Sequence, residues 1–322
     1  MLPASASASA SASASVSRPA RRAVAVPALV AAAAMAASGC AADLGGDAGR
    51  PAAVDPIGGI GHVHGLGVDS ITGTIYLAAH GGVYEVPVSG SDETIGWEQL
   101  AGPIAGRALD PMGFAMLDGQ MFASGHPDPR DLDTSPANLG LITSTDTAQT
   151  WQNVSLSGEV DFHDIAVAPA ADGKLSFYGY RAADGVVMAS GDSGTTWSLG
   201  APLIARDLTV DAGSADTVYA TTEDGLMVSG DRGATFALVE GAPPVYLIEA
   251  VYGADPGLVG IDLTGNVWVQ SEGAWRQSGS TSGEVEAVAF AAAPTPVLVV
   301  ADDRGVSASS DFGATWRTLV AR

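Results

Sequence analysis

The chain has almost no cysteine and few basic residues. Its single cysteine, Cys40, rules out an intramolecular disulfide bond. Against 36 Asp and Glu it carries only 14 Lys and Arg, which gives a formal net charge of −22 at pH 7. A surface this acidic repels the phosphates of nucleic acid and of anionic lipid headgroups, so we expect no nucleic acid partner for the folded part.

Several catalytic signatures are also missing. The sequence contains no Gly-x-Ser-x-Gly elbow, no His-Glu-x-x-His pair and no glycine-rich phosphate loop ahead of a helix. The apolar residues after the N-terminal segment show no helical periodicity. These absences indicate an all-β fold whose many glycines belong to turns.

The first 39 residues have the pattern of a signal peptide. An alternating Ala-Ser tract over 4–15 is followed by three arginines between positions 18 and 22 and by an apolar stretch over 23–37. That stretch is too short for a comfortable membrane span, whereas a basic region followed by a short apolar core is typical of export signals. Removal of residues 1–39 leaves 11 basic against 36 acidic residues, a net charge of −25.

Residues 37–40, Ala-Ser-Gly-Cys, resemble a bacterial lipobox. The resemblance implies that Cys40 is lipidated and anchors the mature protein to the outer face of the cell membrane. Residues 40–57 would then be a flexible Gly-, Ala- and Asp-rich tether. The alternative is a plain secreted protein, cleaved nearby, with an incidental cysteine.

Four copies of one octet, Ser-x-Asp-x-Gly-x-Thr-Trp, run through the chain. They span 144–151, 190–197, 229–236 and 309–316, with Phe236 replacing Trp in the third copy. Self-similarity with a period of about forty residues is typical of a propeller or a solenoid. The Asp carboxylate can accept turn amides and Gly supplies a positive φ, so each octet predicts a hairpin turn closed by a buried aromatic ring.

Aromatic residues that end the octets, or octet-like segments, fall in register six times. They are Trp97, Trp151, Trp197, Phe236, Trp275 and Trp316, separated by 54, 46, 39, 39 and 41 residues. The segments before Trp97 and Trp275 are degenerate octets. We therefore predict a six-bladed β-propeller over residues 58–322, with four short strands in each blade.

The octet resembles the Asp-box, or BNR repeat. The chain as a whole resembles secreted or lipid-anchored bacterial BNR/Asp-box proteins of the sialidase superfamily, which share segments 62–66 (HVHGL), 125–128 (GHPD) and 161–163 (DFH). The resemblance implies a glycosyl hydrolase-like fold with the octets between the third and fourth strands, away from the ligand face. It also implies a structural role for the four octet acids, Asp146, Asp192, Asp231 and Asp311.

Sialidase activity itself is not expected. Sialidases use an arginine triad and usually an Arg-Ile-Pro stretch, but this chain has no Arg-Ile-Pro and no arginine between Pro51 and Arg107. Another glycoside hydrolase remains an alternative, because two suitably separated carboxylates suffice for that reaction. The candidate carboxylates are Asp110, Asp161, Asp164, Glu223, Asp262 and Asp302.

All 5 histidines are predicted to lie on one face of the propeller. They stand at the start of innermost strands or at the end of second strands, and these positions open on the same side; they are His62, His64, His80, His126 and His163. The spacing of His62 and His64 places both rings on one side of a strand, which suits a shared metal ion such as zinc or copper. Nearby acids that could ligate the ion or orient the rings are Asp110, Asp128, Asp161 and Asp164.

Three functions remain open at this level. The first is an extracytoplasmic, lipid-anchored binding module whose histidine face holds a transition metal or a polar ligand without a metal. The second is a glycoside hydrolase, and the third is a scaffold for protein interaction or assembly at the membrane surface. The partner would accordingly be a small ligand, a glycan or a protein, and these histidines could instead only bond loop backbones.

Overall fold

The computed structural model describes residues 60–87, 94–133, 135–253 and 255–322, all within one compact unit. The predicted signal peptide, Cys40 and the tether lie outside the described residues. Within the described ranges, no helix is long and apolar enough to cross a membrane.

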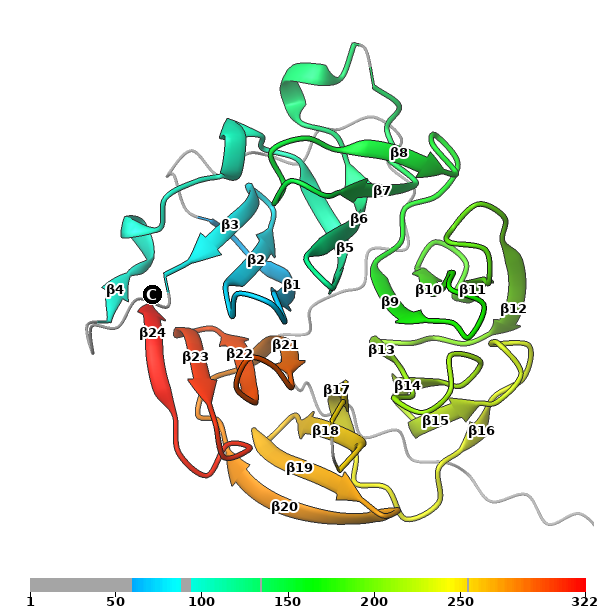
Figure 1. The fold of residues 1–322 in the computed structure, drawn as a ribbon, viewed down its shortest axis with the longest axis vertical. Coiled ribbons are helices and arrows are strands. Elements are labelled where there is room, and N and C mark those ends of the chain that lie inside the picture. Colours follow the sequence, from blue (N-terminus) through cyan, green and yellow to red (C-terminus); the bar gives the residue numbers. More distant parts are fainter. Residues whose placement is uncertain (1–59, 88–93, 134, 254) are drawn as a thin grey trace, which may run out of the picture. The chain divides into compact units, whose positions relative to one another are not determined.

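The described chain folds into six antiparallel sheets arranged in a ring, which confirms the six-bladed propeller (Figure 1). The first two sheets contain β1 (Val63–Val68), β2 (Ile75–Ala79) and β3 (Gly82–Val86), then β5 (Asp110–Leu117), β6 (Gln120–His126), β7 (Leu141–Ser144) and β8 (Gln152–Ser155). The third and fourth contain β9 (Asp164–Pro169), β10 (Leu175–Arg181), β11 (Val186–Ser190) and β12 (Ser198–Pro202), then β13 (Asp207–Val210), β14 (Val218–Thr222), β15 (Gly225–Ser229) and β16 (Ala237–Leu238).

The last two sheets complete the ring. They contain β17 (Val245–Val251), β18 (Gly257–Asp262), β19 (Asn266–Ser271) and β20 (Ala274–Ser280), then β21 (Val285–Ala291), β22 (Val297–Asp302), β23 (Gly305–Ser309) and β24 (Arg317–Ala321). A short strand β4 (Ile95–Gly96) joins the sixth sheet, and three short 3₁₀ helices lie in loops: η1 (Trp97–Gln99), η2 (Ile104–Gly106) and η3 (Pro129–Asp131).

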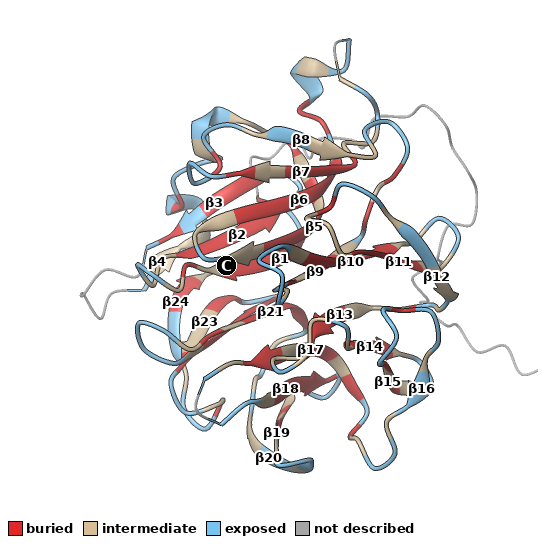
Figure 2. Cartoon of the chain, turned by 45° about the vertical axis from the view of Figure 1, so that its right-hand side comes forward, coloured by how far each residue is buried: buried red, intermediate tan, exposed pale blue. Residues whose placement is uncertain are grey.

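The first strand of each sheet lines the centre of the ring, and apolar side chains pack between neighbouring sheets. Every residue of β2 is buried, whereas the outer strands β12 and β16 are largely exposed (Figure 2). Strands that are buried on both faces contain continuous runs of apolar residues. The sequence therefore shows apolar runs at these strands instead of a strict alternation of apolar and polar residues.

Acidic side chains connect neighbouring innermost strands. Asp164 Oδ2 accepts a hydrogen bond from the Leu208 amide at 2.5 Å, and Asp207 Oδ2 accepts one from the Ile248 amide at 2.6 Å. Each acid therefore ties its own blade to the next through a side-chain-to-backbone hydrogen bond.

The octets form hairpin turns between the third and fourth strands of the second, third, fourth and sixth sheets, as the sequence predicts. In the octet at 190–197, Asp192 Oδ1 accepts the Thr196 amide at 2.8 Å and Oδ2 accepts the Thr196 hydroxyl at 2.7 Å. Ser190 Oγ accepts the Gly194 amide at 3.0 Å. The acids Asp146, Asp231 and Asp311 make the same contacts in their own turns.

The closing aromatic rings pack against the preceding blade. Trp197 Nε1 donates to Ser155 Oγ of β8 at 3.0 Å, and Trp316 Nε1 donates to the Ser280 carbonyl of β20 at 2.8 Å. The fifth sheet differs, because a two-residue turn at Glu272 and Gly273, both with positive φ, replaces its degenerate octet.

The seam between the first and last blades departs from four strands per blade. Among the described residues the first sheet has three strands, and β4 pairs in parallel with β24 of the last sheet. Trp97 follows β4, and the Arg322 guanidinium lies 4.5 Å from the centre of its ring. Residues 95–97, at the end of the first octet-like segment, thus lie at the outer edge of the sixth blade, where they help to close the ring.

We predict that Asp192→Asn lowers the melting temperature at pH 7. Hydrogen bonds from the Thr196 amide and hydroxyl lower the pKa of Asp192 to about 2, below the value of about 4 expected in the unfolded chain. Its contribution is therefore present above pH 4 and is lost as the pH falls towards 2, so the difference from wild type should shrink over that range.

Calorimetry across this pH range tests the prediction, with Asp224→Asn, a change in an exposed turn, as the control. Equal melting temperatures for Asp192→Asn and wild type at pH 7 would contradict it.

Candidate metal centre

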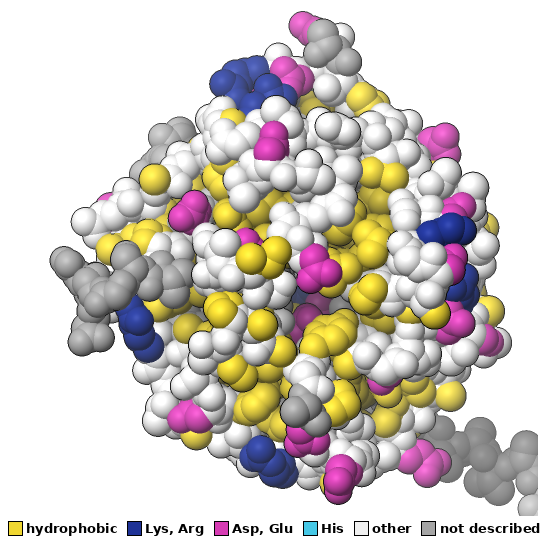
Figure 3. Space-filling view, viewed as in Figure 1, with side chains coloured by type: hydrophobic (Ala, Val, Ile, Leu, Met, Phe, Trp, Pro, Cys, Tyr) yellow, Lys and Arg dark blue, Asp and Glu magenta, His cyan; other side chains and the backbone are white. Residues whose placement is uncertain are grey.

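The five histidines gather around the mouth of the central channel. His62, His64 and His163 line a cavity of about 420 Å³ there, together with Tyr180, Arg206 and Tyr246. His80 contacts His64, and His126 shares an acid with His163. No histidine is visible on the face drawn in Figure 3, whose hollowed centre bears acidic side chains.

His64, His80 and Asp110 form a compact cluster. His64 lies in β1, His80 follows β2, and Asp110 begins β5 of the next blade. The His80 Nδ1 atom lies 3.0 Å from Asp110 Oδ1 and 3.3 Å from His64 Nε2, and the His64 Nε2 atom lies 3.8 Å from Asp110 Oδ1. The three potential ligand atoms therefore converge on one point.

These distances fit a transition metal ion. Ligands bound at about 2.0–2.2 Å in a tetrahedral site lie about 3.3–3.5 Å apart, which is close to the separations in the cluster. Two imidazoles and a carboxylate form a donor set that suits zinc and copper and leaves a coordination position open.

The protonation states of the two rings differ. Burial, followed by the charge of His80, lowers the pKa of His64 to about 4, so this imidazole is neutral at pH 7 with a lone pair available for a metal. The hydrogen bond with Asp110 raises the pKa of His80. A metal ion would therefore displace the proton that His80 and Asp110 share.

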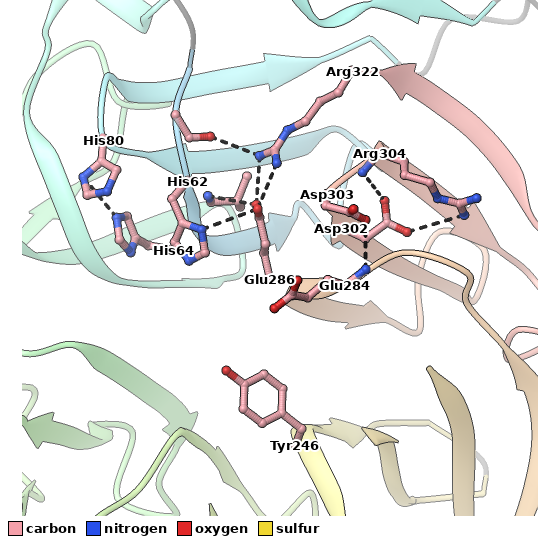
Figure 4. A network of polar contacts seen from close by, with 12 residues as sticks. His62, His64, His80, Tyr246, Glu284, Glu286, Asp302, Asp303, Arg304 and Arg322 are labelled. Atoms are coloured by element: carbon pink, nitrogen blue, oxygen red, sulfur yellow. Dashed lines mark hydrogen bonds and ion pairs between the residues drawn. The ribbon is translucent and has the colours of Figure 1, made fainter. Parts of the chain in front are cut away.

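His62 points to a different partner. Its Nδ1 atom lies 3.4 Å from Glu286 Oε1 of β21, and its ring centre is 5.4 Å from that of His64 (Figure 4). The predicted pairing of His62 and His64 on one ion is thus replaced by His64 with His80, because the chain bulges between Val63 and Gly65.

Glu286 fixes the start of β1. Its Oε2 atom accepts the Val63 amide at 3.1 Å, and Arg322 donates to Oε1 at 2.8 Å and to Oε2 at 2.9 Å. Burial raises the pKa of Glu286, but the hydrogen bonds from His62, Arg322 and Val63 outweigh it and set the pKa at about 2. The strand that carries His64 therefore depends on the seam that closes the ring.

His126, Asp161 and His163 form a second cluster. Asp161 Oδ2 lies 3.0 Å from His163 Nε2 and 3.5 Å from His126 Nε2, and His126 Nδ1 lies 3.0 Å from the Ala137 carbonyl, to which it donates. Asp161 Oδ1 has no hydrogen-bond partner among the described residues. The structure thus divides the five histidines between two clusters and Glu286.

Two acids predicted for this site form hydrogen bonds with other groups than the imidazoles. Asp128 is buried at the start of η3, where it accepts the Ala108 amide at 2.8 Å and the Arg130 amide at 2.9 Å. Hydrogen bonds from the Arg130 side chain hold its pKa far below the usual range. Asp164 lies in the channel, where burial and the neighbouring Asp207 raise its pKa well above the usual range.

Sequence reasoning missed three acids of the channel. They are Asp207, Glu249 and Glu286, and they line the channel together with Arg206. Burial raises the pKa of Asp207 to about 6 and that of Glu249 well above its usual value. For Asp207 and Glu286 the available signal was their position at the start of innermost strands, the rule that located His64. Glu249 lies further along β17 and carried no such signal.

No protein-family model matches the chain, and no curated protein does. Among solved structures it is similar to XC5397 from Xanthomonas campestris, described as a gluconolactonase, with a TM-score of 0.52 and 12% identity over 77% of this chain and 85% of that one. A chain of the nidogen/laminin complex gives a TM-score of 0.51 and 11% identity over 74% and 89%.

A GH74 enzyme of Niastella koreensis gives a TM-score of 0.48 and 18% identity over 79% of this chain but only 37% of that one. At such low identity, the two similarities with TM-scores above 0.5 show a shared fold alone.

We expect Glu286→Gln to lower the free energy of unfolding by about 2–4 kcal/mol. Loss of one partner of a buried pair leaves the other charge without compensation, and the partial exposure of Arg322 keeps the cost towards the lower end. Urea denaturation at pH 7 measures it. Arg304→Gln is the control: it removes the 3.8 Å contact between an exposed guanidinium and Asp302 and should change stability by less than about 0.5 kcal/mol. An equal loss in both variants would contradict the assigned role of Glu286.

Proposed function

We propose that this protein is an extracytoplasmic, lipid-anchored β-propeller that binds a divalent transition metal, zinc or copper, through His64, His80 and Asp110. The observation that carries the proposal is the convergence of these three groups, with ligand atoms 3.0–3.8 Å apart at the mouth of the channel.

The electrostatic setting supports this assignment. His64 is partly buried and neutral at pH 7, which makes it a ligand rather than a competing charge. Asp110 contributes the negative charge that a divalent cation requires, and the backbone of two paired strands and of the adjacent blade fixes the three groups. Little side-chain entropy would be lost on binding, because the donors already lie together.

The mouth of the propeller supports a role in binding more than one in glycoside hydrolysis. Asp110 and Asp161 engage histidines, and Asp262 accepts hydrogen bonds from Thr264, Asn266 and Trp268. These acids are therefore committed to local partners, whereas a glycosidase needs a free acid and a free base or nucleophile.

We predict that zinc binds the wild-type protein in a 1:1 ratio, as measured by isothermal titration calorimetry and by metal analysis of dialysed protein. His64→Ala and His80→Ala each remove a ligand, so their loss of affinity should exceed the 10- to 100-fold typical of outer-shell partners, about two orders of magnitude or more. Asp110→Asn should reduce affinity as well, because it removes the only charge of the donor set.

The matched control is His126→Ala, which deletes an imidazole of the second cluster and should leave zinc affinity unchanged. Wild-type protein that binds neither zinc nor copper would overturn the proposal. An equal loss in His126→Ala and His64→Ala would place the ion elsewhere.

For the anchor, we predict that Cys40→Ser moves the protein from the detergent phase to the aqueous phase in Triton X-114 partitioning of expressing bacterial cells. The change removes the thiol that would carry the lipid, and it lies outside the propeller. Metabolic labelling with a fatty acid is the direct measurement, and equal labelling of both proteins would contradict lipidation at Cys40.

A further inference from the structure

Arg206 is unusual among the arginines of the described chain. Six others form ion pairs with carboxylates, namely Arg107, Arg130, Arg181, Arg232, Arg304 and Arg322. Arg206 lies at the mouth of the channel, and within the described ranges no carboxylate oxygen comes within the 4.0 Å that defines such a pair. Asp207 and Asp164 stabilise its charge only from a longer distance. Without a direct carboxylate partner, the guanidinium can offer its remaining N–H groups to a ligand.

The contacts of Arg206 hold the side chain and leave donors free. Its Nε atom donates to the Tyr246 hydroxyl at 2.8 Å, and its Nη2 atom donates to the Glu286 carbonyl at 2.9 Å. The guanidinium carbon lies 5.0 Å from the centre of the Tyr246 ring. These contacts come from two other blades, so they position the guanidinium across the channel.

The nearby channel acids are directed elsewhere. Asp164 accepts the Leu208 and Ile165 amides, and Asp207 accepts the Ile248 amide. Their oxygens therefore join innermost strands together, and they influence Arg206 only over a longer distance. The guanidinium keeps hydrogen-bonding capacity that neither acid uses.

We infer that the mouth cavity binds a small organic carboxylate, held by the guanidinium of Arg206. A planar guanidinium matches a carboxylate with two parallel hydrogen bonds. The cavity, at about 420 Å³, lies within the range of about 300–1,000 Å³ typical of small-molecule sites.

The acidic residues of the cavity rim indicate which groups the ligand should carry besides its carboxylate. Glu284 and Asp303 lie at the rim provided by the sixth blade, near Asp302 and Arg304 (Figure 4). They would accept hydrogen bonds from hydroxyl or ammonium groups. They also disfavour a doubly charged phosphate, which is why a singly charged carboxylate with donor groups fits better. His64, a ligand of the proposed metal centre, lines the same cavity. Arg206 is not one of the proposed metal ligands, so carboxylate binding does not depend on a bound ion.

The test is a ligand-observed NMR titration of the metal-free protein with glycolate and glycine, and with their neutral amides glycolamide and glycinamide. We expect the acids to bind and the amides to bind at least about tenfold more weakly, since a charge-assisted bidentate pair is lost. Arg206→Gln should weaken binding of the acids by a similar factor. Arg206→Lys keeps the charge but loses the fork, so an intermediate loss is expected.

Arg304→Gln is the matched control, because it removes an arginine near the same rim that is already paired with Asp302, and it should bind the acids like wild type. Circular dichroism and zinc titration of each variant report folding and the metal centre separately, so failure of one proposal is distinguishable from failure of the other.

Equal affinity for acids and amides would overturn the inference, as would binding unchanged in a folded Arg206→Gln or Arg206→Lys variant. Arg206-dependent binding of inorganic phosphate with no binding of either acid would overturn the choice of carboxylate.

Discussion

The rest of this structure depends on the hydrogen bonds that the Glu286 carboxylate accepts at the junction of the first and last blades. The sheets of a propeller are not joined in one continuous ladder, so the ring needs contacts at the seam between its first and last blades. Here the pairing of β4 with β24 supplies backbone contacts, and Glu286 supplies side-chain contacts. Glu286 bonds the first amide of β1, the side chain of Arg322 and the ring of His62, and Arg322 in turn lies over Trp97. Ring closure and the geometry of the histidine strand are therefore set by the same group.

The two faces of the propeller use acids in different ways. In the octet turns, each Asp is saturated by amides and hydroxyls of its own hairpin, which keeps it ionised and inert. At the mouth and in the channel, the acids contact histidines, the amides of neighbouring strands or, for Glu286, the guanidinium of Arg322. Carboxylates whose pKa values are shifted by burial cluster there, as is common at functional sites.

The fold was predictable because its signals are local. An octet contains its own hydrogen-bond partners, so the turn forms wherever the sequence occurs, and regular spacing then counts the blades. The seam was less predictable: Trp97 keeps the register of the other aromatic residues, yet β4 pairs with β24, some 220 residues away. No local sequence pattern predicts such a pairing, because the two strands meet only when the whole ring closes.

The sequence by itself determined that five histidines belong near one face, since the position of a residue at the start or end of a strand decides the side on which it lies. The tertiary structure alone decided which of them meet. His64, beside a bulge in β1, lies against His80, whereas His62 pairs with Glu286. Asp161 lies next to both His126 and His163. These choices depend on side chains from neighbouring blades, and their distances are set by the radius and closure of the ring rather than by spacing along the chain.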